Sequence, residues 1–167
     1  MTQAPGSVDL IARLVAAQPP RLVLDTNVIM ALWHFEDPRL VGLQAWIEAR
    51  QAVLLTRAEC LDELHRVLAY PQFGIAPERQ AQIADAYAMR AECLPSQTVE
   101  QLAAAAGLPQ CKDRDDQKFL TLALDGAAHA LLSRDKLLLG LARRAPYRDH
   151  FFIATPERVQ TAVSPVA

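Results

Sequence analysis

The chain has 167 residues, of which 51% are hydrophobic and 22% are charged, with 17 lysines and arginines against 19 aspartates and glutamates. This hydrophobic content excludes a disordered chain, and the length suits one domain with a sizeable core. A net charge of −2 argues against a protein that holds nucleic acid by a positive field over its whole surface. We expect one domain over residues 1–167, with a lead-in at 1–20 and a core at 21–160.

The sequence has no feature of a membrane or secreted protein. No segment approaches the roughly eighteen uninterrupted apolar residues that a membrane span needs. The first residues, Met1–Ser7, lack the basic and apolar segments of a secretory signal. The cysteines at 60, 93 and 111 have neither zinc-site spacing nor the even number of a disulfide framework. These observations predict a cytoplasmic protein.

Short apolar runs alternate with amphipathic segments along the chain. The apolar runs predict strands at residues 21–24, 52–55, 128–133 and 151–153. The amphipathic segments predict helices at about 27–34, 38–50, 57–70, 77–90, 98–107, 114–125 and 135–140, with a closing helix from 155. Strands that alternate with helices pair in parallel, so the pattern predicts a layered α/β domain with a parallel central sheet.

Three helices are expected to begin at recognisable capping residues. Thr56 with Glu59, and Thr98 with Gln101, each fit the capping-box spacing. Thr155 suits an N-cap, and the proline that follows it suits the first helical position. The sequence therefore predicts three helix starts to within a residue.

Two acidic residues are predicted at the ends of strands. Asp25 directly follows the strand at 21–24, and Asp135 comes two residues after Ser133 at the end of a later strand. Ligands of open parallel sheets bind beyond the carboxyl ends of the strands. We therefore expect both carboxylates at the ligand-binding edge of the sheet.

Two further acids are predicted on inward-facing parts of helices. Asp116 precedes Phe119, Leu120 and Ala123 by three, four and seven residues, which places it on their face of a helix. Glu63 lies at the edge of the apolar stripe of the helix after residue 56. Both side chains are therefore candidates for the same site.

Four converging carboxylates require a counter-charge. They have no arginine or lysine partner nearby in sequence, and like charges in one pocket repel one another and destabilise the fold. Mg²⁺ or Mn²⁺ suits a cluster that is rich in oxygen and contains no cysteine. Such an ion can activate water and stabilise the charge that develops on a phosphodiester. Each acid taken singly also fits a turn, a cap or a solvated surface.

At these residues the sequence resembles the PIN-domain family. Residues 22–28, Leu-Val-Leu-Asp-Thr-Asn-Val, are similar to the opening strand and motif of that family. Residues 63–68 resemble its Glu-Leu-x-x-Val-Leu element, and residues 113–123 its Asp-x-Asp-Asp-x-x-Phe-Leu-x-Leu-Ala segment. Residues 133–138 resemble the closing block, Ser/Thr-x-Asp-x-Asp/Leu-Leu. The four blocks occur in the order of the family and cover nearly the whole chain.

The resemblance implies a three-layer, Rossmann-like α/β/α sandwich and a Mg²⁺- or Mn²⁺-dependent endoribonuclease that hydrolyses single-stranded or structured RNA. The branch resembled comprises toxin components of bacterial toxin–antitoxin systems, which implies an antitoxin partner and a homodimer. By motif, the catalytic and metal-binding carboxylates would be Asp25, Glu63, Asp116 and Asp135, supported through hydrogen bonds by Asn27 and Ser133. One departure is Arg114, which stands where the family often has proline.

Other functions are less consistent with the sequence than a nuclease. A phosphatase of the haloacid dehalogenase type needs a second carboxylate two residues after the first aspartate, where this chain has Asn27. A receiver module needs a pair of acids at a strand end before Arg21, and none is present. The remaining alternative is a PIN-like binding or scaffold module with weak catalysis. All four acidic positions are filled, which favours an active nuclease.

Overall fold

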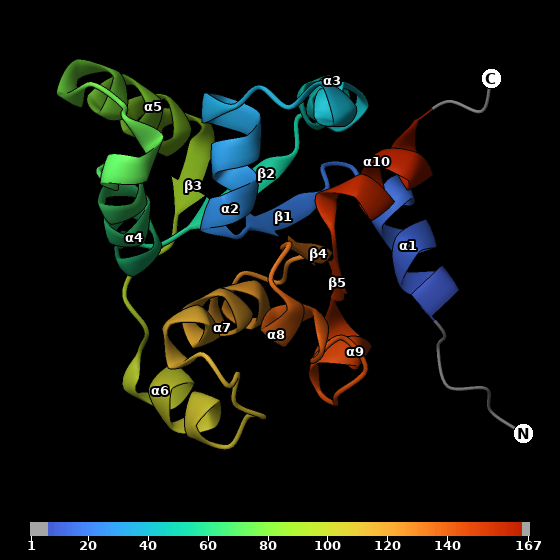
Figure 1. Ribbon diagram of the computed structural model, residues 1–167. Coiled ribbons are helices and arrows are strands. Elements are labelled where there is room, and N and C mark those ends of the chain that lie inside the picture. The colour runs from blue at the N-terminus through green and yellow to red at the C-terminus, as the bar shows by residue number, and fades with distance from the viewer. Residues whose placement is uncertain (1–6, 165–167) are drawn as a thin grey trace, which may run out of the picture.

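The structure, a computed structural model, describes residues 7–164 (Figure 1). The expectation about a secretory signal rests mostly on residues 1–6, which lie outside the described residues. A central sheet contains five parallel strands in the order β3-β2-β1-β4-β5. The strands are β1 (Arg21–Leu24), β2 (Val53–Thr56), β3 (Ala91–Cys93), β4 (Ala130–Leu132) and β5 (Phe152–Ala154). The predicted parallel sheet is confirmed.

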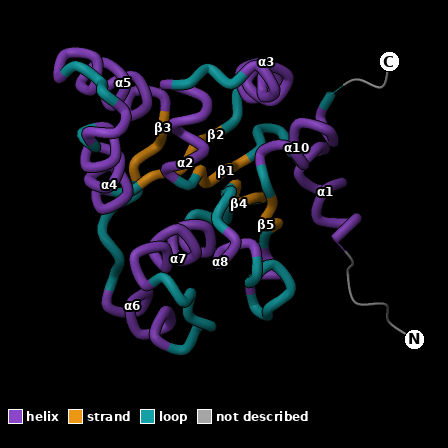
Figure 2. Tube along the Cα trace, viewed as in Figure 1, coloured by secondary structure: helices purple, strands orange, loops and turns teal. Residues whose placement is uncertain are grey.

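Helices connect all successive strands (Figure 2). They are α1 (Ser7–Ala16), α2 (Thr26–Ile29), α3 (Val41–Ala49), α4 (Ala58–Leu68), α5 (Pro77–Arg90), α6 (Val99–Ala106), α7 (Gln117–Asp125), α8 (Lys136–Leu139), α9 (Tyr147–His150) and α10 (Pro156–Val163). A π-helix at Met30–His34 continues α2, and short 3₁₀ turns occupy Pro38–Leu40, Pro71–Phe73 and Arg114–Asp116. None of the helices in residues 7–164 has the length and hydrophobicity that a membrane span requires.

The sheet separates two hydrophobic cores. Leu22 and Leu24 of β1 pack on one face with residues of α1, α2, α3, α5 and α10. Val23 packs on the opposite face with residues of α7, α8 and α9. Successive strand side chains point to opposite faces, so a strand buried on both sides reads as a continuous apolar run. In Figure 1 the two helical layers lie above and below the sheet, which confirms the α/β/α sandwich.

The structure corrects two predictions around β2. Thr56 does not cap a helix: it is the last residue of β2, and its carbonyl accepts a hydrogen bond from the Leu94 N–H at 2.9 Å. Pairing with β3 extends the strand by one residue, so Arg57 becomes the N-cap of α4 and makes no side-chain capping bond. Strand β3 was not predicted, because Ala91–Cys93 is a mostly exposed edge strand without an apolar pattern.

The other two helix starts are confirmed. The Gln101 N–H donates to the Thr98 hydroxyl at 3.1 Å, and the Gln101 side chain accepts from the Thr98 N–H at 2.9 Å. The Arg158 N–H donates to the Thr155 hydroxyl at 3.2 Å. These contacts satisfy N–H groups that have no partner within the helix itself. Local hydrogen-bonding chemistry therefore fixes the first turns of α6 and α10.

The strand order places a ligand-binding crevice at the end of β1. The chain passes from β1 through β2 to β3 on one side and then crosses to β4 and β5 on the other. Ligands of open α/β sheets bind where the order reverses in this way, beyond the carboxyl ends of the strands. Asp25 and Ser133 follow the two strands at this point, and the Asp25 N–H donates to the Leu132 carbonyl at 2.9 Å.

A buried ion pair joins three segments next to the carboxyl end of β2. Arg57 is only 2% exposed, and its Nη1 contacts the Asp125 carboxylate at 2.8 Å. Its Nε donates to the Pro95 carbonyl at 3.1 Å, and Gln97 donates to the same aspartate at 3.1 Å. The end of β2, the segment before α6 and the end of α7 are therefore held together by charge-assisted hydrogen bonds.

We expect Arg57→Met to lower the free energy of unfolding by about 3–5 kcal/mol, because it leaves the Asp125 carboxylate without its partner. The matched change Arg90→Met removes a more exposed pair with Glu48, at 3.3 Å, and should cost less than about 1 kcal/mol. Urea unfolding followed by circular dichroism measures both variants. Equal losses would contradict the buried pair's role.

Candidate active site

All four predicted acids line one cleft of about 410 Å³ at the carboxyl edge of the sheet. They come from four separate elements: Asp25 follows β1, Glu63 lies on α4, Asp116 precedes α7 and Asp135 precedes α8. Asp113 lines the same cleft. The structure therefore brings together carboxylates that are up to 110 positions apart in the sequence.

Asp25 is the most enclosed of the four acids, at 5% exposure. Its Oδ2 accepts hydrogen bonds from the Ser133 hydroxyl at 2.6 Å and from Asn27 Nδ2 at 3.1 Å. Ser133 Oγ accepts the Asp135 N–H at 2.9 Å, and Asn27 Oδ1 accepts the Arg134 N–H at 3.3 Å. The two residues expected to support the site thus join the ends of β1 and β4 through Asp25.

Asp135 also serves as a helix cap. Its Oδ1 accepts the backbone N–H groups of Leu137 at 2.7 Å and Leu138 at 3.3 Å, at the start of α8. Its Oδ2 makes no hydrogen bond within residues 7–164. The capping contacts orient the carboxylate, and the second oxygen remains available to the cleft.

Asp116 lies in a 3₁₀ turn rather than in an α-helical turn. The predicted helix from residue 114 begins as the turn Arg114–Asp116, and α7 starts one residue after Asp116. Asp116 is half-buried, and it makes no side-chain capping bond to α7. Asp113 caps the turn by accepting the Asp115 N–H at 3.0 Å.

Glu63 has a lysine partner that the sequence did not reveal. Its Oε1 lies 2.8 Å from Lys118 Nζ, and its Oε2 accepts a hydrogen bond from the Thr26 hydroxyl. Lys118 Nζ also donates to the Asp115 carbonyl. The expectation concerned only partners nearby in sequence, whereas Lys118 lies 55 positions from Glu63 and meets it between α4 and α7. Thr26 was not among the predicted site residues. Its position between Asp25 and Asn27 in the Asp-Thr-Asn motif is the sequence signal that could have identified it as a site residue.

The acids raise one another's proton affinity. Burial is the main cause that raises the pKa of Asp25 to about 6, against the lowering effect of the Ser133 hydroxyl, and Glu63 raises it further. Burial, followed by repulsion from Asp25 and Asp113, raises the pKa of Asp116 to about 7. Near neutral pH the cleft therefore holds carboxylates whose charged forms are disfavoured, and a cation would stabilise those forms.

The donor chemistry of the cleft fits a hard divalent cation. Carboxylate oxygens are the ligands that Mg²⁺ and Mn²⁺ prefer, and burial together with mutual repulsion raises the pKa values of Asp25 and Asp116 in the absence of an ion. Within residues 7–164, no three acidic, histidine or cysteine side chains already stand close enough to hold one ion. Coordination by three carboxylates therefore requires their side chains to rotate toward the ion.

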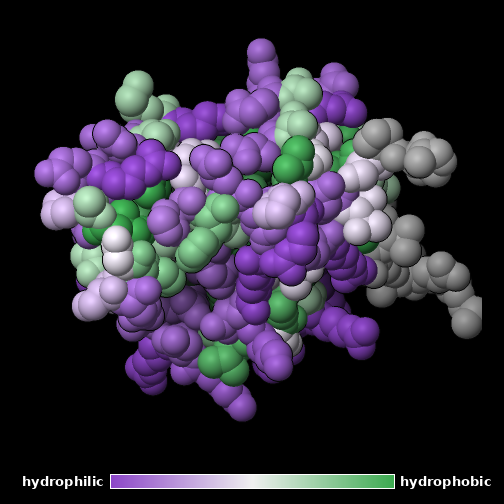
Figure 3. All heavy atoms as spheres, turned by 45° about the horizontal axis from the view of Figure 1, so that its top comes forward, coloured by the Kyte–Doolittle hydropathy of each residue, from purple (hydrophilic) through white to green (hydrophobic). Residues whose placement is uncertain are grey.

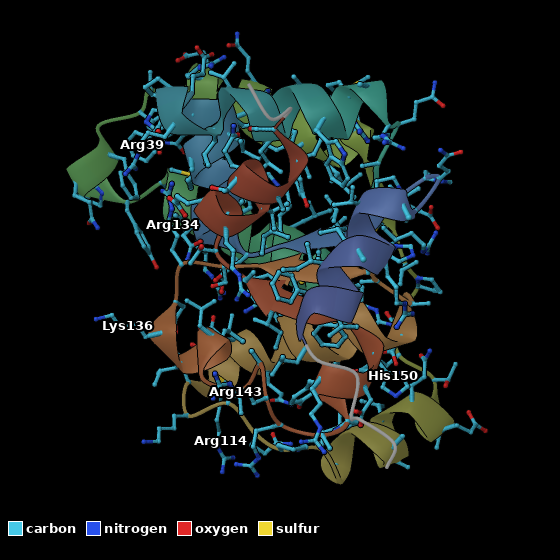
Figure 4. All side chains as sticks on the ribbon, turned by 90° about the vertical axis from the view of Figure 1, so that its right-hand side faces the viewer. Arg39, Arg114, Arg134, Lys136, Arg143 and His150 are labelled. Carbon is cyan, nitrogen blue, oxygen red and sulfur yellow. The ribbon has the colours of Figure 1, made fainter. Side chains whose placement is uncertain are left out.

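Basic side chains extend along the same side of the molecule. Figure 4 shows a row that runs from one helical layer to the other and contains Arg39, Arg134, Lys136, Arg143 and Arg114. Arg134 lines the cleft itself and pairs with Asp37 at 3.0 Å and Glu157 at 2.5 Å. Lys136, Arg143 and Arg114 are exposed and form no salt bridge within residues 7–164. A local positive surface thus flanks the acidic cleft despite the net charge of −2.

We expect Asp116→Asn to stabilise the metal-free protein at pH 8. The pKa of Asp116 rises from an ordinary 3.8 to about 7 in the fold, so ionisation destabilises the folded state progressively from about pH 4 to pH 7. The stabilisation should therefore shrink as the pH falls below 7 and be small at pH 4. Thermal unfolding in EDTA measures it, with the exposed neighbour Asp115→Asn as control. A pH-independent effect would contradict this account.

Comparisons with known proteins agree with the fold. The family model of the PIN domain matches residues 21–137, which is well over half of the chain. No curated protein and no solved structure is significantly similar to this chain. PIN domains are generally nucleases, and they generally use divalent metal ions. The matched segment contains the four predicted acids of the cleft, and the chain belongs to the PIN domain family.

Proposed function

We propose that this protein is a Mg²⁺- or Mn²⁺-dependent endoribonuclease. The observation that carries the proposal is the meeting of Asp25, Glu63, Asp116 and Asp135 in one cleft of a PIN domain. Hydrolysis of a phosphodiester needs positive charge near the phosphate and an activated water molecule. A carboxylate cleft that binds a divalent cation can provide both.

The four acids have different roles in this proposal. Asp25 and Asp116 are the first choices for direct contact with the ion, because both lie at the ends of elements and line the cleft at the carboxyl edge of the sheet. Asp135 contributes its free Oδ2, since backbone groups occupy its Oδ1. Glu63 is already engaged by Thr26 and Lys118, so it acts through water or after exchange of the lysine. A bound divalent ion supplies the Lewis acidity that activates water and offsets charge on the phosphate.

Two polar residues keep Asp25 oriented and charged. The Ser133 hydroxyl and the Asn27 amide donate to the same oxygen, Asp25 Oδ2, and hydrogen bonds of this kind favour the ionised carboxylate. Ser133 is fully buried, so bulk water does not compete for this contact. We assign both residues a positioning role, as partners that orient ligands in metal sites commonly have.

The basic row supports RNA as the substrate. Lys136 follows Asp135 directly, and Arg114 lies two residues before Asp116, so positive charge lies close to two of the acids in sequence. Contacts to backbone phosphates position a nucleic acid without reading its sequence. Because the chain as a whole is slightly acidic, such contacts hold RNA locally and weakly, which suits a substrate that must be released.

One observation favours the alternative of a weakly catalytic binding module. The ion pair between Glu63 and Lys118, at 2.8 Å, already neutralises one of the four acids. If this pair persists when RNA binds, the cleft offers fewer charged ligands to a metal ion than the sequence suggests. The cleavage assay below separates this alternative from an active nuclease.

We expect the wild-type chain to cleave single-stranded RNA with Mg²⁺ or Mn²⁺, and Asp25→Asn to lose nearly all of this activity. The substitution keeps the size of the side chain and removes the charge that binds the cation. Gel analysis of labelled RNA, with EDTA as the metal-free control and the exposed Asp149→Asn as the matched variant, measures the effect. Equal and negligible cleavage by the wild type and Asp25→Asn would favour the binding module.

We further propose that the nuclease acts in the cytoplasm as the toxin of a toxin–antitoxin pair and forms a homodimer. The resemblance of residues 113–123 and 133–138 to that branch of the family supports this role. Exposed apolar side chains on α6, Val99 at 78% and Leu102 at 55% exposure, offer a surface for such contacts. A small DNA-binding protein encoded by a neighbouring gene would support the antitoxin assignment.

Expression in a bacterial host tests the toxin role. We expect the wild-type chain to arrest growth and Asp25→Asn, produced at the same level, to leave growth unchanged, because toxicity requires RNA cleavage. Growth curves with matched immunoblots measure the difference. Arrest by both proteins would mean that toxicity does not come from the acidic cleft.

A further inference from the structure

One end of the acidic cleft is aromatic. Phe35 and Phe73 line the same cleft as the carboxylates, and their rings meet edge to face with centroids 5.9 Å apart. Tyr70 stacks on Phe73 at 6.3 Å, with only 14° between the ring planes. We call Phe35, Tyr70 and Phe73 the aromatic cluster. It lies beside the candidate site but takes no part in the chemistry assigned to the acids.

The cluster leaves large aromatic surfaces in contact with solvent. Phe35 is 56% exposed and Tyr70 is 44% exposed, whereas Phe119, Phe151 and other large side chains are almost fully buried. Exposed aromatic surface that gathers at a cleft commonly marks a binding site. Figure 3 shows that hydrophobic residues on the face it displays lie in patches within a largely hydrophilic surface.

The backbone on either side of Phe35 has an unusual conformation. Phe35 follows the π-helix at Met30–His34, and its N–H donates to the Met30 carbonyl at 2.9 Å. The next residue, Glu36, has φ = 47°, a left-handed conformation that residues other than glycine rarely adopt. π-Helical turns are rare in proteins, and those that occur are often found at functional sites. These features place Phe35 directly at the end of a helical segment.

The second side of the cluster is connected to the acids through α4. Glu63 and Val67, one helical turn apart, both line the cleft, and the helix ends just before Tyr70. The path from Glu63 to Tyr70 is seven residues, or roughly 10 Å along a helix. A 3₁₀ turn then carries Phe73 back into the cleft. A nucleotide that neighbours the reacting phosphate would therefore find aromatic rings within its reach.

We propose that the aromatic cluster is a stacking platform for an unpaired base next to the scissile phosphate, so that the preferred substrate is single-stranded RNA. This inference rests on the proposed nuclease function. Exposed rings beside a charged cleft match the chemistry of a nucleotide, whose flat base stacks while its phosphate meets the cation site. Bases within a duplex are stacked on one another and offer no free face to the cluster.

Binding measurements on Phe35→Ala test the platform, in an Asp25→Asn background that spares the RNA. Fluorescence anisotropy in EDTA compares a labelled single-stranded RNA with a duplex of the same composition. We expect Phe35→Ala to weaken single-strand binding about tenfold or more and to leave duplex binding unchanged. Phe35→Trp, which retains an aromatic face, should bind the single strand as the parent does. Met89→Ala on α5, which is 89% exposed and does not line the cleft, is the matched control.

Two results would overturn the platform. Unchanged single-strand binding by Phe35→Ala would leave the cluster as a surface for a protein partner, and equal losses for both RNAs would mean that base stacking is not the interaction. Cleavage by the wild-type chain, measured in parallel, keeps this test separate from that of the nuclease. If the wild-type chain cleaves RNA but Phe35→Ala does not change single-strand binding, the platform alone is rejected. If Phe35→Ala selectively weakens single-strand binding but the wild-type chain does not cleave RNA, the nuclease function alone is rejected.

Discussion

The hydrogen bonds that Asp25 accepts from Ser133 and Asn27 hold the candidate site together. They join the ends of β1 and β4, which are adjacent only because the strand order reverses at β1. Ser133 in turn accepts the N–H of Asp135, so the same contact orients the start of α8. A buried carboxylate is costly unless hydrogen bonds or a cation compensate its charge. The fold therefore provides part of that compensation and leaves the rest to a ligand.

The distribution of charge explains how a slightly acidic chain can act on RNA. Negative charge is concentrated in the cleft, where burial and repulsion raise the pKa of Asp25 to about 6 and that of Asp116 to about 7. Positive charge follows one side of the molecule in a row that includes Lys136 and Arg143. A divalent cation between the acids would convert the most negative region into one that attracts a phosphate. The aromatic cluster adds a surface suited to a base, so phosphate and base would meet different chemistry in one cleft.

Much of the fold was predictable because burial leaves a pattern in the sequence. The segments at 22–24 and 54–55 are buried on both faces and apolar throughout, which is the pattern that predicts their strands. β3 was missed because an exposed edge strand carries no such pattern. Thr56 was assigned to a helix because its spacing to Glu59 fits a capping box, but pairing between β2 and β3 keeps it in the sheet. The pairing of β2 with β3 therefore outweighed the local capping-box pattern.

The sequence by itself determined the class of the fold and the four acids, because strand ends and helix faces follow from local periodicity, and the family motifs mark the same positions. Only the tertiary structure decided what surrounds each acid. Lys118 reaches Glu63 across 55 positions, and the Phe35 ring meets the Phe73 ring in the lining of the cleft. Such contacts depend on how α2, α4 and α7 pack against the sheet. Side-chain partners that come from different helices leave no periodic signal in the chain, and for this reason the environment of the site appears only when the elements are assembled.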